Sequence, residues 1–213
     1  MTSATKSAPT SPSPNLRLIL AVTGASGSIF AAEMLRALDA DQRVARIDFI
    51  PSEASLRVFA EEMQLSGRNA LAEKLLGPGH ASLSKITQHA EADIGANVAS
   101  GSYRSDGMIV LPCTVGTLAG IANGMASNLI ERAADVCLKE RRRLILCVRE
   151  TPFNRIHLRN MQLADEAGAT IFPVMPTLYN LPRDTTEMAR QFVHRVLAHI
   201  GLPQPGAYEW KPD

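Results

Sequence analysis

Short apolar runs alternate with stretches of helical periodicity along most of this chain. The apolar runs predict β-strands at residues 16–23, 46–51, 107–112, 144–149 and 170–174. Helical patterns occupy residues 28–39, 53–63, 116–123, 128–141, 156–167 and 185–200. Strands that alternate with helices form parallel sheets covered on both sides. The pattern therefore predicts an α/β fold, with a Rossmann-like, doubly wound, mostly parallel sheet and helices on both faces.

Two segments depart from this alternation. Residues 64–106 carry Gly67, a Gly-Pro-Gly sequence at 77–79 and the small-residue run 99–102, and we expect a helix, a connector and a loop there. Residues 1–15 are rich in Ser, Thr and Pro and contain little that could be buried, which predicts a disordered N-terminal tail. The 213-residue length then favours a single domain over residues 16–203.

Composition narrows the classes of partner. A formal net charge of +1 argues against nucleic acid or an acidic membrane as the main partner, because both require a clustered basic excess. We find no signal peptide and no apolar stretch long enough to span a membrane. The three cysteines, Cys113, Cys137 and Cys147, lack a C-x-x-C spacing, and the histidines show no helical metal pair. We therefore expect a cytoplasmic protein without a disulfide framework or a metal site.

The first candidate for chemistry is the sequence Thr-Gly-Ala-Ser-Gly-Ser at residues 23–28, between a strand and a helix. Glycines permit a tight turn, while hydroxyls and helix-start N–H groups can bind a phosphate. The third glycine of the dinucleotide fingerprint is missing and no acidic residue clearly ends the second strand, so a mononucleotide is favoured over a nicotinamide dinucleotide. The simpler alternative is a plain turn in which Ser28 caps the helix.

A second hydroxyl-rich turn follows the strand at 107–112, and Ser52 follows the strand at 46–51. The carboxyl ends of parallel strands meet at one edge of a sheet, so these groups are expected to share one crevice. Cys113 is a conceivable nucleophile, but its neighbours are apolar and no histidine pairs with it in the sequence. A buried and inert thiol is the favoured interpretation.

Several cationic residues could bind anions near this crevice. Arg132, Asp135 and Lys139 share one helix face, although a solvated salt-bridge stripe is the usual meaning of that spacing. The pair Arg149-Glu150 ends an apolar strand, where it either forms an ion pair that caps the next helix or meets a ligand. Together with Arg195, these cations exceed what one nucleotide phosphate requires, which suggests a second anionic substrate.

A resemblance to a known family rests on five sequences. They are Thr-Gly-Ala-Ser-Gly at 23–27, Ser-Gly-Ser at 100–102, Pro-Cys-x-x-Gly-Thr-Leu at 112–118, Asn-Leu-Ile-Glu-Arg-Ala-Ala-Asp-Val-x-Leu-Lys-Glu-Arg-Arg at 128–142, and Arg-Glu-Thr-Pro at 149–152. Over about residues 16–210 the chain resembles the UbiX-type flavin prenyltransferases. The resemblance implies a metal-independent transfer of a dimethylallyl group from dimethylallyl phosphate to N5 and C6 of reduced FMN. It also implies a dodecamer with sites between subunits, and a UbiD-type decarboxylase that uses the product.

The resemblance assigns roles to residues of this chain. Catalytic roles fall to Ser26, Glu62, Lys139 and Glu150, with Glu62 coming from a neighbouring subunit. FMN binding falls to Gly24, Ala25, Ser26, Ser52, Cys113, Thr114, Val115, Gly116, Thr117 and Arg149. Binding of the prenyl phosphate falls to Arg132, Lys139, Glu150, Tyr179 and Arg195. The tail at residues 204–213 is expected to pack on a neighbouring subunit.

Two other classes of protein share features with this chain. FMN-dependent cysteine decarboxylases have the same fold, but their Pro-Ala-Ser-Ala-Asn-Thr and Pro-x-Met-Asn signatures are absent here. A non-catalytic flavin-binding subunit would keep the two turns and could lose the cationic residues. All of those cations are present, which favours the enzyme.

Overall fold

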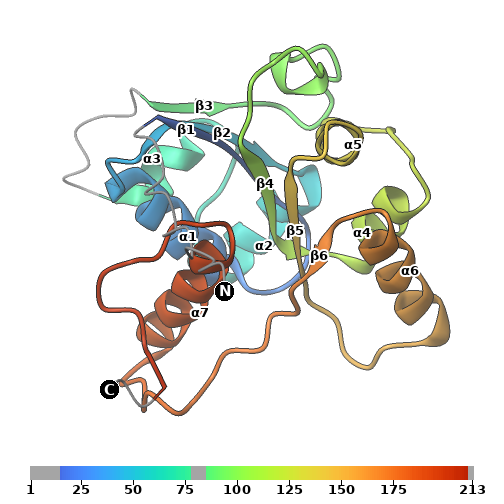
Figure 1. Cartoon of the computed structure of the whole chain (residues 1–213). Helices are drawn as coiled ribbons and strands as arrows, with labels where there is room; N and C mark the ends of the chain where they lie inside the picture. The colour runs from blue at the N-terminus through green and yellow to red at the C-terminus, as the bar shows by residue number, and fades with distance from the viewer. Residues whose placement is uncertain (1–14, 78–84, 211–213) are drawn as a thin grey trace, which may run out of the picture.

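Six parallel strands form a single sheet in the described part of the chain, in the order β3-β2-β1-β4-β5-β6 (Figure 1). The computed structural model describes residues 15–77 and 85–210. All five neighbouring pairs are parallel. The strands are β1 (Leu16–Val22), β2 (Val44–Pro51), β3 (Ile86–Gln88), β4 (Gly107–Cys113), β5 (Arg143–Val148) and β6 (Thr170–Ile171).

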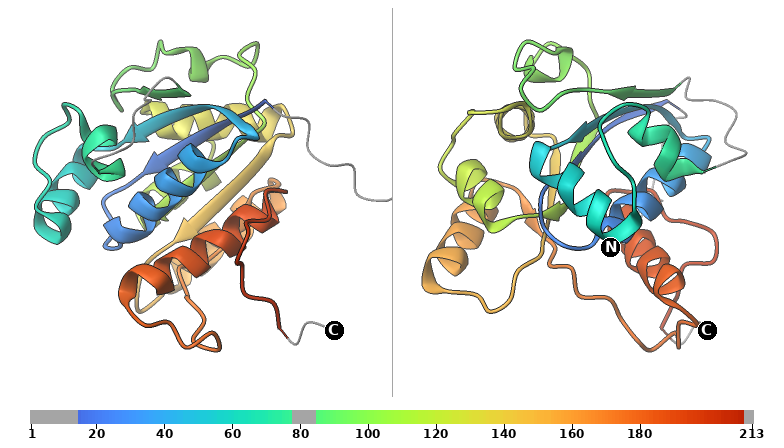
Figure 2. Two further views of the ribbon diagram at one scale, coloured as in Figure 1. Left: turned by 90° about the vertical axis from the view of Figure 1, so that its left-hand side faces the viewer. Right: turned by 180° about the vertical axis from the view of Figure 1, so that it is seen from behind.

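Helices cover both faces of the sheet, which confirms the predicted doubly wound fold (Figure 2). Side chains alternate along β1, with Leu18 and Leu20 in one apolar core and Ile19 and Ala21 in the other. The first core contains α1 (Ser28–Ala40), α3 (Leu71–Leu76) and α7 (Thr185–His199). The second contains α4 (Val115–Ala122), α5 (Leu129–Lys139) and α6 (Arg155–Glu166). The helix α2 (Glu53–Met63) follows β2 and buries Phe59 in the first core.

The differences from the predicted elements are local. The helix expected within 64–106 is α3, but β3 was missed because a three-residue strand of half-buried side chains shows no pattern. The strand expected at 170–174 is only two residues long as β6, although the N–H groups of Phe172 and Val174 continue to bond to β5. Pro173, which has no N–H, lies between them. The predicted connector at 77–79 and the N-terminal tail fall almost wholly outside the described residues.

The topology defines where a ligand crevice should lie. From β1 the chain moves outward to β2 and β3, and it then returns to β4 on the other side of β1. In open parallel sheets this reversal leaves a crevice at the carboxyl ends of the two central strands. Both predicted turns follow these two strands. No helix within the described ranges is long and apolar enough to cross a membrane.

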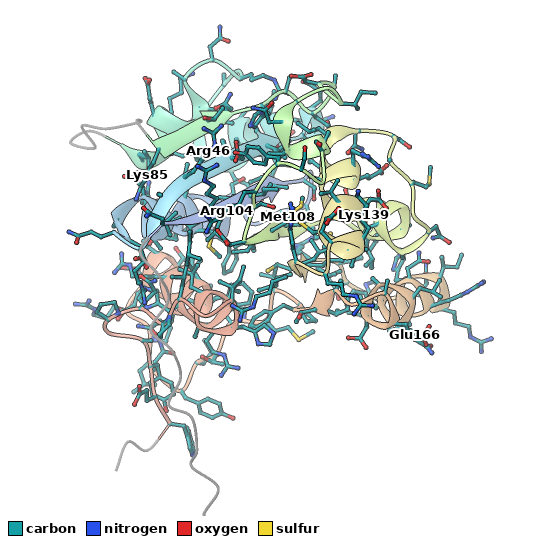
Figure 3. All side chains as sticks on the ribbon, turned by 45° about the horizontal axis from the view of Figure 1, so that its top comes forward. Arg46, Lys85, Arg104, Met108, Lys139 and Glu166 are labelled. Carbon is teal, nitrogen blue, oxygen red and sulfur yellow. The ribbon has the colours of Figure 1, made fainter. Side chains whose placement is uncertain are left out.

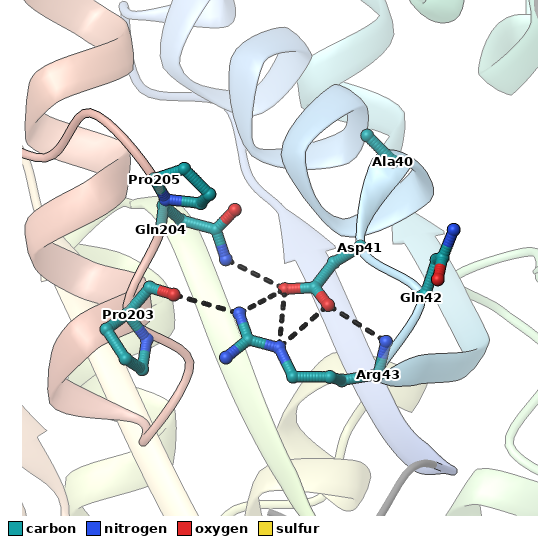
Figure 4. Close-up of a pocket in the computed structure, with 7 residues that line it drawn as sticks. All are labelled: Ala40, Asp41, Gln42, Arg43, Pro203, Gln204 and Pro205. Atoms are coloured by element: carbon teal, nitrogen blue, oxygen red, sulfur yellow. Dashed lines mark hydrogen bonds and ion pairs between the residues drawn. The ribbon is translucent and has the colours of Figure 1, made fainter.

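The opposite, amino-terminal end of the sheet carries a hollow of about 600 Å³ whose polar contacts are internal (Figure 4). Asp41 accepts hydrogen bonds there from the Arg43 side chain, at 2.6 and 2.9 Å, and from Gln204, at 2.9 Å. Arg43 also donates to the carbonyl of Pro203 at 2.9 Å. The cluster therefore ties the α1–β2 turn to the chain that follows α7.

This cluster predicts a pH-dependent contribution to stability. The hydrogen bonds from the Arg43 side chain hold the pKa of Asp41 at about 2, below its ordinary value of 3.8. A depressed carboxyl pKa stabilises the fold above the unfolded value, and this stabilisation is lost as the pH falls through the folded value. Replacing Asp41 with Asn should lower the free energy of unfolding by about 1 kcal/mol at neutral pH, after discounting for solvent screening. Denaturant titrations should show this difference shrinking between pH 4 and pH 2, and a pH-independent difference would contradict the assignment.

Candidate functional site

The β1–α1 turn presents backbone N–H groups and an exposed hydroxyl at the carboxyl end of β1. Gly27 is the N-cap of α1, with a φ of 122° that suits glycine, and Ser26 beside it is exposed. Gly24 lies against α2, because a Cβ atom added there would be only 2.6 Å from the Cβ of Ala54. A larger residue at position 24 would therefore push α2 away from the turn.

The carboxylate of Glu62, on α2, closes this turn. Its oxygens accept hydrogen bonds from the N–H groups of Ser28, at 2.7 Å, and Gly27, at 3.0 Å. Partial burial acts to raise the pKa of Glu62, but hydrogen bonds from the Ser26 hydroxyl and these N–H groups hold it below its ordinary value. The alternative in which Ser28 caps α1 is wrong, since Gly27 is the cap and Glu62 bonds the free N–H groups. Here Glu62 contacts its own chain, and its delivery by a neighbour stays a prediction.

A single hydroxyl joins the two predicted turns. Thr23 donates to the carbonyl of Pro112 at 2.8 Å and accepts from the N–H of Thr114 at 2.8 Å. Thr114 caps α4 by accepting from the N–H of Thr117 at 3.2 Å, and the two threonine hydroxyls lie 3.0 Å apart. A Cβ added at Gly116 would meet only the Thr114 hydroxyl, at 3.9 Å. The backbone of this second turn is thus open to a ligand.

Ser52 and Cys113, two of the residues predicted to bind flavin, are buried. Ser52 is 4% exposed, and its hydroxyl caps α2 by accepting from the N–H of Ser55 at 3.0 Å. The Cys113 side chain is fully buried, and burial raises the pKa of its thiol to about 12. The structure therefore confirms that Cys113 is buried and disfavours a nucleophilic role for it. At this position a ligand would meet the main chain.

Arg149 and Glu150 follow β5, next to the second turn. The N–H of Arg149 donates to the carbonyl of Cys113 at 3.0 Å. The exposed Arg149 guanidinium makes no hydrogen bond or ion pair within the described part of the chain, and Glu150 accepts only from the N–H of Thr151, at 2.9 Å. The alternative of an ion pair that caps the next helix is wrong, because Asn154 and His157 form the capping box of α6.

Arg132 and Lys139 lie along one side of α5, next to the loop of residues 99–103 (Figure 3 labels Lys139). The guanidinium of Arg132 pairs with Asp135 at 2.9 Å and donates to the carbonyl of Ala99 at 3.1 Å. Lys139 pairs with Glu140 at 3.1 Å, and a Cβ added at Gly101 would lie 2.8 Å from its ammonium nitrogen. The prediction that Arg132, Asp135 and Lys139 share one helix face is confirmed. The alternative, a salt bridge along that face, is observed between Arg132 and Asp135.

Two further residues at this loop were not predicted as part of the site. Gly101 leaves the space in which Lys139 and Glu140 lie, and Arg142 donates to the Gly101 carbonyl at 2.7 Å. Both residues belong to sequences that mark the family resemblance: Gly101 to Ser-Gly-Ser at 100–102, and Arg142 to the Glu-Arg-Arg that ends the 128–142 sequence. Neither sequence shows which residue of one meets which residue of the other.

Tyr179 and Arg195 form a second cluster. They line a cavity of about 200 Å³ together with Thr177, Gln191, Tyr208 and Trp210. The rings of Tyr179 and Trp210 meet edge to face, with centroids 5.0 Å apart. Arg195 is on α7, which covers the first core, whereas Arg132 and Lys139 are on α5, which covers the second. One subunit therefore does not bring the predicted phosphate-binding residues together.

The doubly wound sheet, with two hydroxyl-bearing turns at its point of reversal, defines an α/β protein of the nucleotide-binding class. The sequence matches the family described as Flavoprotein over residues 6–200. It is 41% identical over 190 residues to a Salmonella typhimurium protein named flavin prenyltransferase UbiX, covering 89% of this chain and 94% of that one. A protein of the same name from Halalkalibacterium halodurans is 37% identical over 191 residues, covering 89% and 90%. The chain belongs to the Flavoprotein family, and within it to the UbiX-type flavin prenyltransferases.

Solved structures agree with this assignment. The structure of AnUbiX (PadA1) in complex with FMN and dimethylallyl pyrophosphate has a TM-score of 0.83 and 36% identity, covering 93% of this chain and 99% of that one. A dodecameric FMN-dependent UbiX-like decarboxylase from Escherichia coli O157:H7 has a TM-score of 0.82 and 37% identity, covering 92% and 100%. The cysteine decarboxylase TvaF is 18% identical with a TM-score of 0.54, covering 73% of this chain and 88% of that one, and so shares only the fold.

Proposed function

We propose that this protein is a flavin prenyltransferase, which transfers a dimethylallyl group from dimethylallyl phosphate to N5 and C6 of reduced FMN. The observation that carries the proposal is the junction of two hydroxyl-bearing turns through Thr23, with the Arg149 guanidinium beside it, which pairs with no residue that the structure describes. The donors at this junction suit an anionic, planar mononucleotide. Family membership supplies the reaction.

The residues present fit a flavin mononucleotide. The open backbone at Gly116, the Thr114 and Thr117 hydroxyls and the Arg149 guanidinium offer donors for the phosphate and the polar ring edge. Gly24 and Ala25 would let the chain pass close to the flavin ring, and Ser26 would lie near the reacting edge of that ring. Reduced FMN supplies the nucleophilic positions N5 and C6. Because Glu62 already bonds the first N–H groups of α1, we assign the phosphate to the second turn.

The cationic residues act on the leaving group. Breaking the allylic C–O bond builds negative charge on the departing phosphate. The guanidinium groups of Arg132 and Arg195 and the ammonium group of Lys139 would stabilise that charge once the assembly brings them to one phosphate. Tyr179, which lies beside Arg195, would donate a hydrogen bond to the same phosphate. This arrangement requires no metal.

Two carboxylates have separate roles in this proposal. Glu150 is half-buried and follows Arg149 at the end of β5, where it would carry a proton between flavin N5 and phosphate. Glu62 accepts a hydrogen bond from the Ser26 hydroxyl and so fixes that side chain at the β1–α1 turn. Both groups are thus positioned before substrate arrives.

The direct test is to incubate the purified protein with reduced FMN and dimethylallyl phosphate without oxygen and to determine the mass of the flavin. We expect a gain of one C5H8 unit and release of inorganic phosphate. A flavin of unchanged mass, recovered from protein that has bound both substrates, would reject the proposed reaction. Incubating the protein with a cysteine-containing peptide tests the alternative, a cysteine decarboxylase. No feature of this site favours that alternative.

A symmetric oligomer follows from the separation of the two cationic clusters. Leu178, Tyr179 and Leu181 are each more than 60% exposed on the segment before α7, as is Trp210 in the tail. An apolar surface of this kind on a small protein marks a site of association. We propose that Tyr179 and Arg195 of one subunit face Arg132 and Lys139 of another in a closed assembly, as the dodecameric relative suggests. The described part of the 204–213 tail lies on its own α7, and its packing on a neighbour remains part of this proposal.

Mixing two inactive variants tests the shared site. Arg132→Ala and Arg195→Ala should each be inactive when pure, because each removes one phosphate ligand from every site. Subunits mixed, dissociated and reassembled should recover activity in about a quarter of the sites, since some sites then receive both intact clusters. A mixture that stays inactive although mass spectrometry shows mixed oligomers would contradict the shared site, and so would a fully active monomer.

The wider context is also a proposal. The three cysteines are free and buried, which suits a reducing compartment, and we propose a cytoplasmic location. A UbiD-type decarboxylase is the proposed user of the product.

A further inference from the structure

Asp48 is a buried carboxylate outside the proposed site. It lies on β2 between Ile47 and Phe49, which belong to the first core, so its side chain points toward the opposite face of the sheet. Its exposed fraction is 0%. Burying a charge without partners is strongly unfavourable, so the groups around Asp48 determine whether the buried carboxylate is tolerated.

Three side chains surround this carboxylate. Arg46 donates to it at 3.1 Å, the His89 ring nitrogen lies 2.8 Å from it, and the Tyr103 hydroxyl donates to it at 2.6 Å. Burial acts to raise the pKa of Asp48, but these three hydrogen bonds hold it below its ordinary value. Burial and the bond to Asp48 raise the pKa of Tyr103 to about 12, so its hydroxyl remains a donor. Arg46 also lies over the Tyr103 ring, 5.8 Å from the centroid.

Tyr103 connects this cluster to the loop of residues 99–103. Arg142 donates to the Tyr103 carbonyl at 2.8 Å and to the Gly101 carbonyl at 2.7 Å. The other end of the loop contacts α5, through the bond from Arg132 to Ala99 and the close approach of Lys139 to Gly101. Figure 3 labels Arg46 on β2 and Lys139 on α5, the two elements between which the loop lies.

We propose that Asp48 and Tyr103 are positioning residues for the prenyl-phosphate site: their hydrogen bond fixes the loop against which Arg132 and Lys139 lie. This inference rests on the proposed function, since it assigns those two cations to the leaving phosphate. Asp48 is the rigid end of the connection, because it is held within β2. The loop carries no regular structure beyond one turn of helix η2 (Asn97–Ala99), so its side-chain and carbonyl contacts determine its position.

Small displacements at such a site have large effects on catalysis. If the Tyr103 hydroxyl is lost, the loop loses its hydrogen bond to β2 and is held by Arg132 and Arg142. The backbone against which Arg132 and Lys139 lie is then less firmly fixed. FMN should be unaffected, because none of the proposed flavin-binding residues contacts Asp48 or Tyr103. The signature of positioning is therefore a change in KM for the prenyl donor without a change in flavin affinity.

The variant to test is Tyr103→Phe, which keeps the ring and removes only the hydroxyl. In the full-length oligomer we expect KM for dimethylallyl phosphate to rise about tenfold, the size of one lost hydrogen bond to a charged group, with the FMN dissociation constant unchanged. Hydrogen exchange of the amides of residues 99–106 should become faster. Inorganic phosphate should slow that exchange in wild type, and about tenfold more phosphate should be needed in the variant.

Asp41→Asn is the matched control, because it also weakens a cluster built on a buried carboxylate and an arginine, but at the amino-terminal end of the sheet. It should lower stability and leave KM and exchange in residues 99–106 as in wild type. A Tyr103→Phe protein with wild-type KM and exchange would overturn the inference, as would equal changes in Asp41→Asn. The exchange and phosphate measurements need no turnover. Failure of wild type to prenylate FMN would thus reject the proposed function, while these measurements still decide whether Tyr103 positions the loop.

Discussion

Replacing Lys139 with Ala should reduce prenylated-flavin formation by about a hundredfold, because it removes a fixed cation from the developing phosphate charge. Glu150→Gln should lose on the order of a hundredfold or more through the loss of proton transfer. Both variants should retain bound FMN, since neither side chain belongs to the two hydroxyl-bearing turns. Measuring bound FMN and prenylated product separately, under anaerobic single-turnover conditions, distinguishes these effects.

The structure supplies a control for the lysine. Glu140 pairs with Lys139 at 3.1 Å but has no assigned role, so Glu140→Gln removes the ion pair and keeps the cation. Exposed ion pairs contribute little to stability, and this variant should fold and turn over like wild type. Normal turnover in Lys139→Ala would show that Lys139 serves only the ion pair. Normal turnover in Glu150→Gln would leave Glu150 without a catalytic role.

The second large effect is expected at Gly24. Gly24→Val should weaken FMN retention by about a hundredfold, because even one added carbon would lie 2.6 Å from the Cβ of Ala54 and force α2 away from the turn. Flavin absorbance of the purified protein and equilibrium dialysis measure the loss. Gly95→Val is the control, since a Cβ there meets only Asp93, at 3.6 Å.

A second substitution, on α2, distinguishes two causes of lost FMN binding: a clash between residue 24 and α2, and a direct contact between residue 24 and flavin. Gly24→Ala combined with Ala54→Gly removes the clashing methyl group and leaves the nearest α2 backbone atoms at 3.4 and 3.5 Å, which is ordinary contact. The double variant should fold normally and recover FMN. If Gly24→Val itself folds and retains FMN as wild type does, the flavin crevice is not at this turn.

Most of this fold could be predicted from the sequence, because the signals for its strands, helices and turns each extend over only a few residues. The apolar runs of β1, β4 and β5, the helical periodicity of α2 and α7, and the glycines and hydroxyls of the turns each act over a few residues. Strand β3 was missed because Ile86–Gln88 is short and half-buried, and it is a strand only because β2 lies beside it. The motifs that mark the family were also readable, since they are contiguous.

Contacts between distant segments were decided only by the tertiary structure. No local rule brings Glu62 to the start of α1, the Thr23 hydroxyl to the β4–α4 turn, or Tyr103 to Asp48, since each contact joins residues more than thirty positions apart. The same holds for the division of the cations between α5 and α7. Periodicity indicates which face of a helix is polar, whereas the order of strands in the sheet determines which face of the molecule that helix covers.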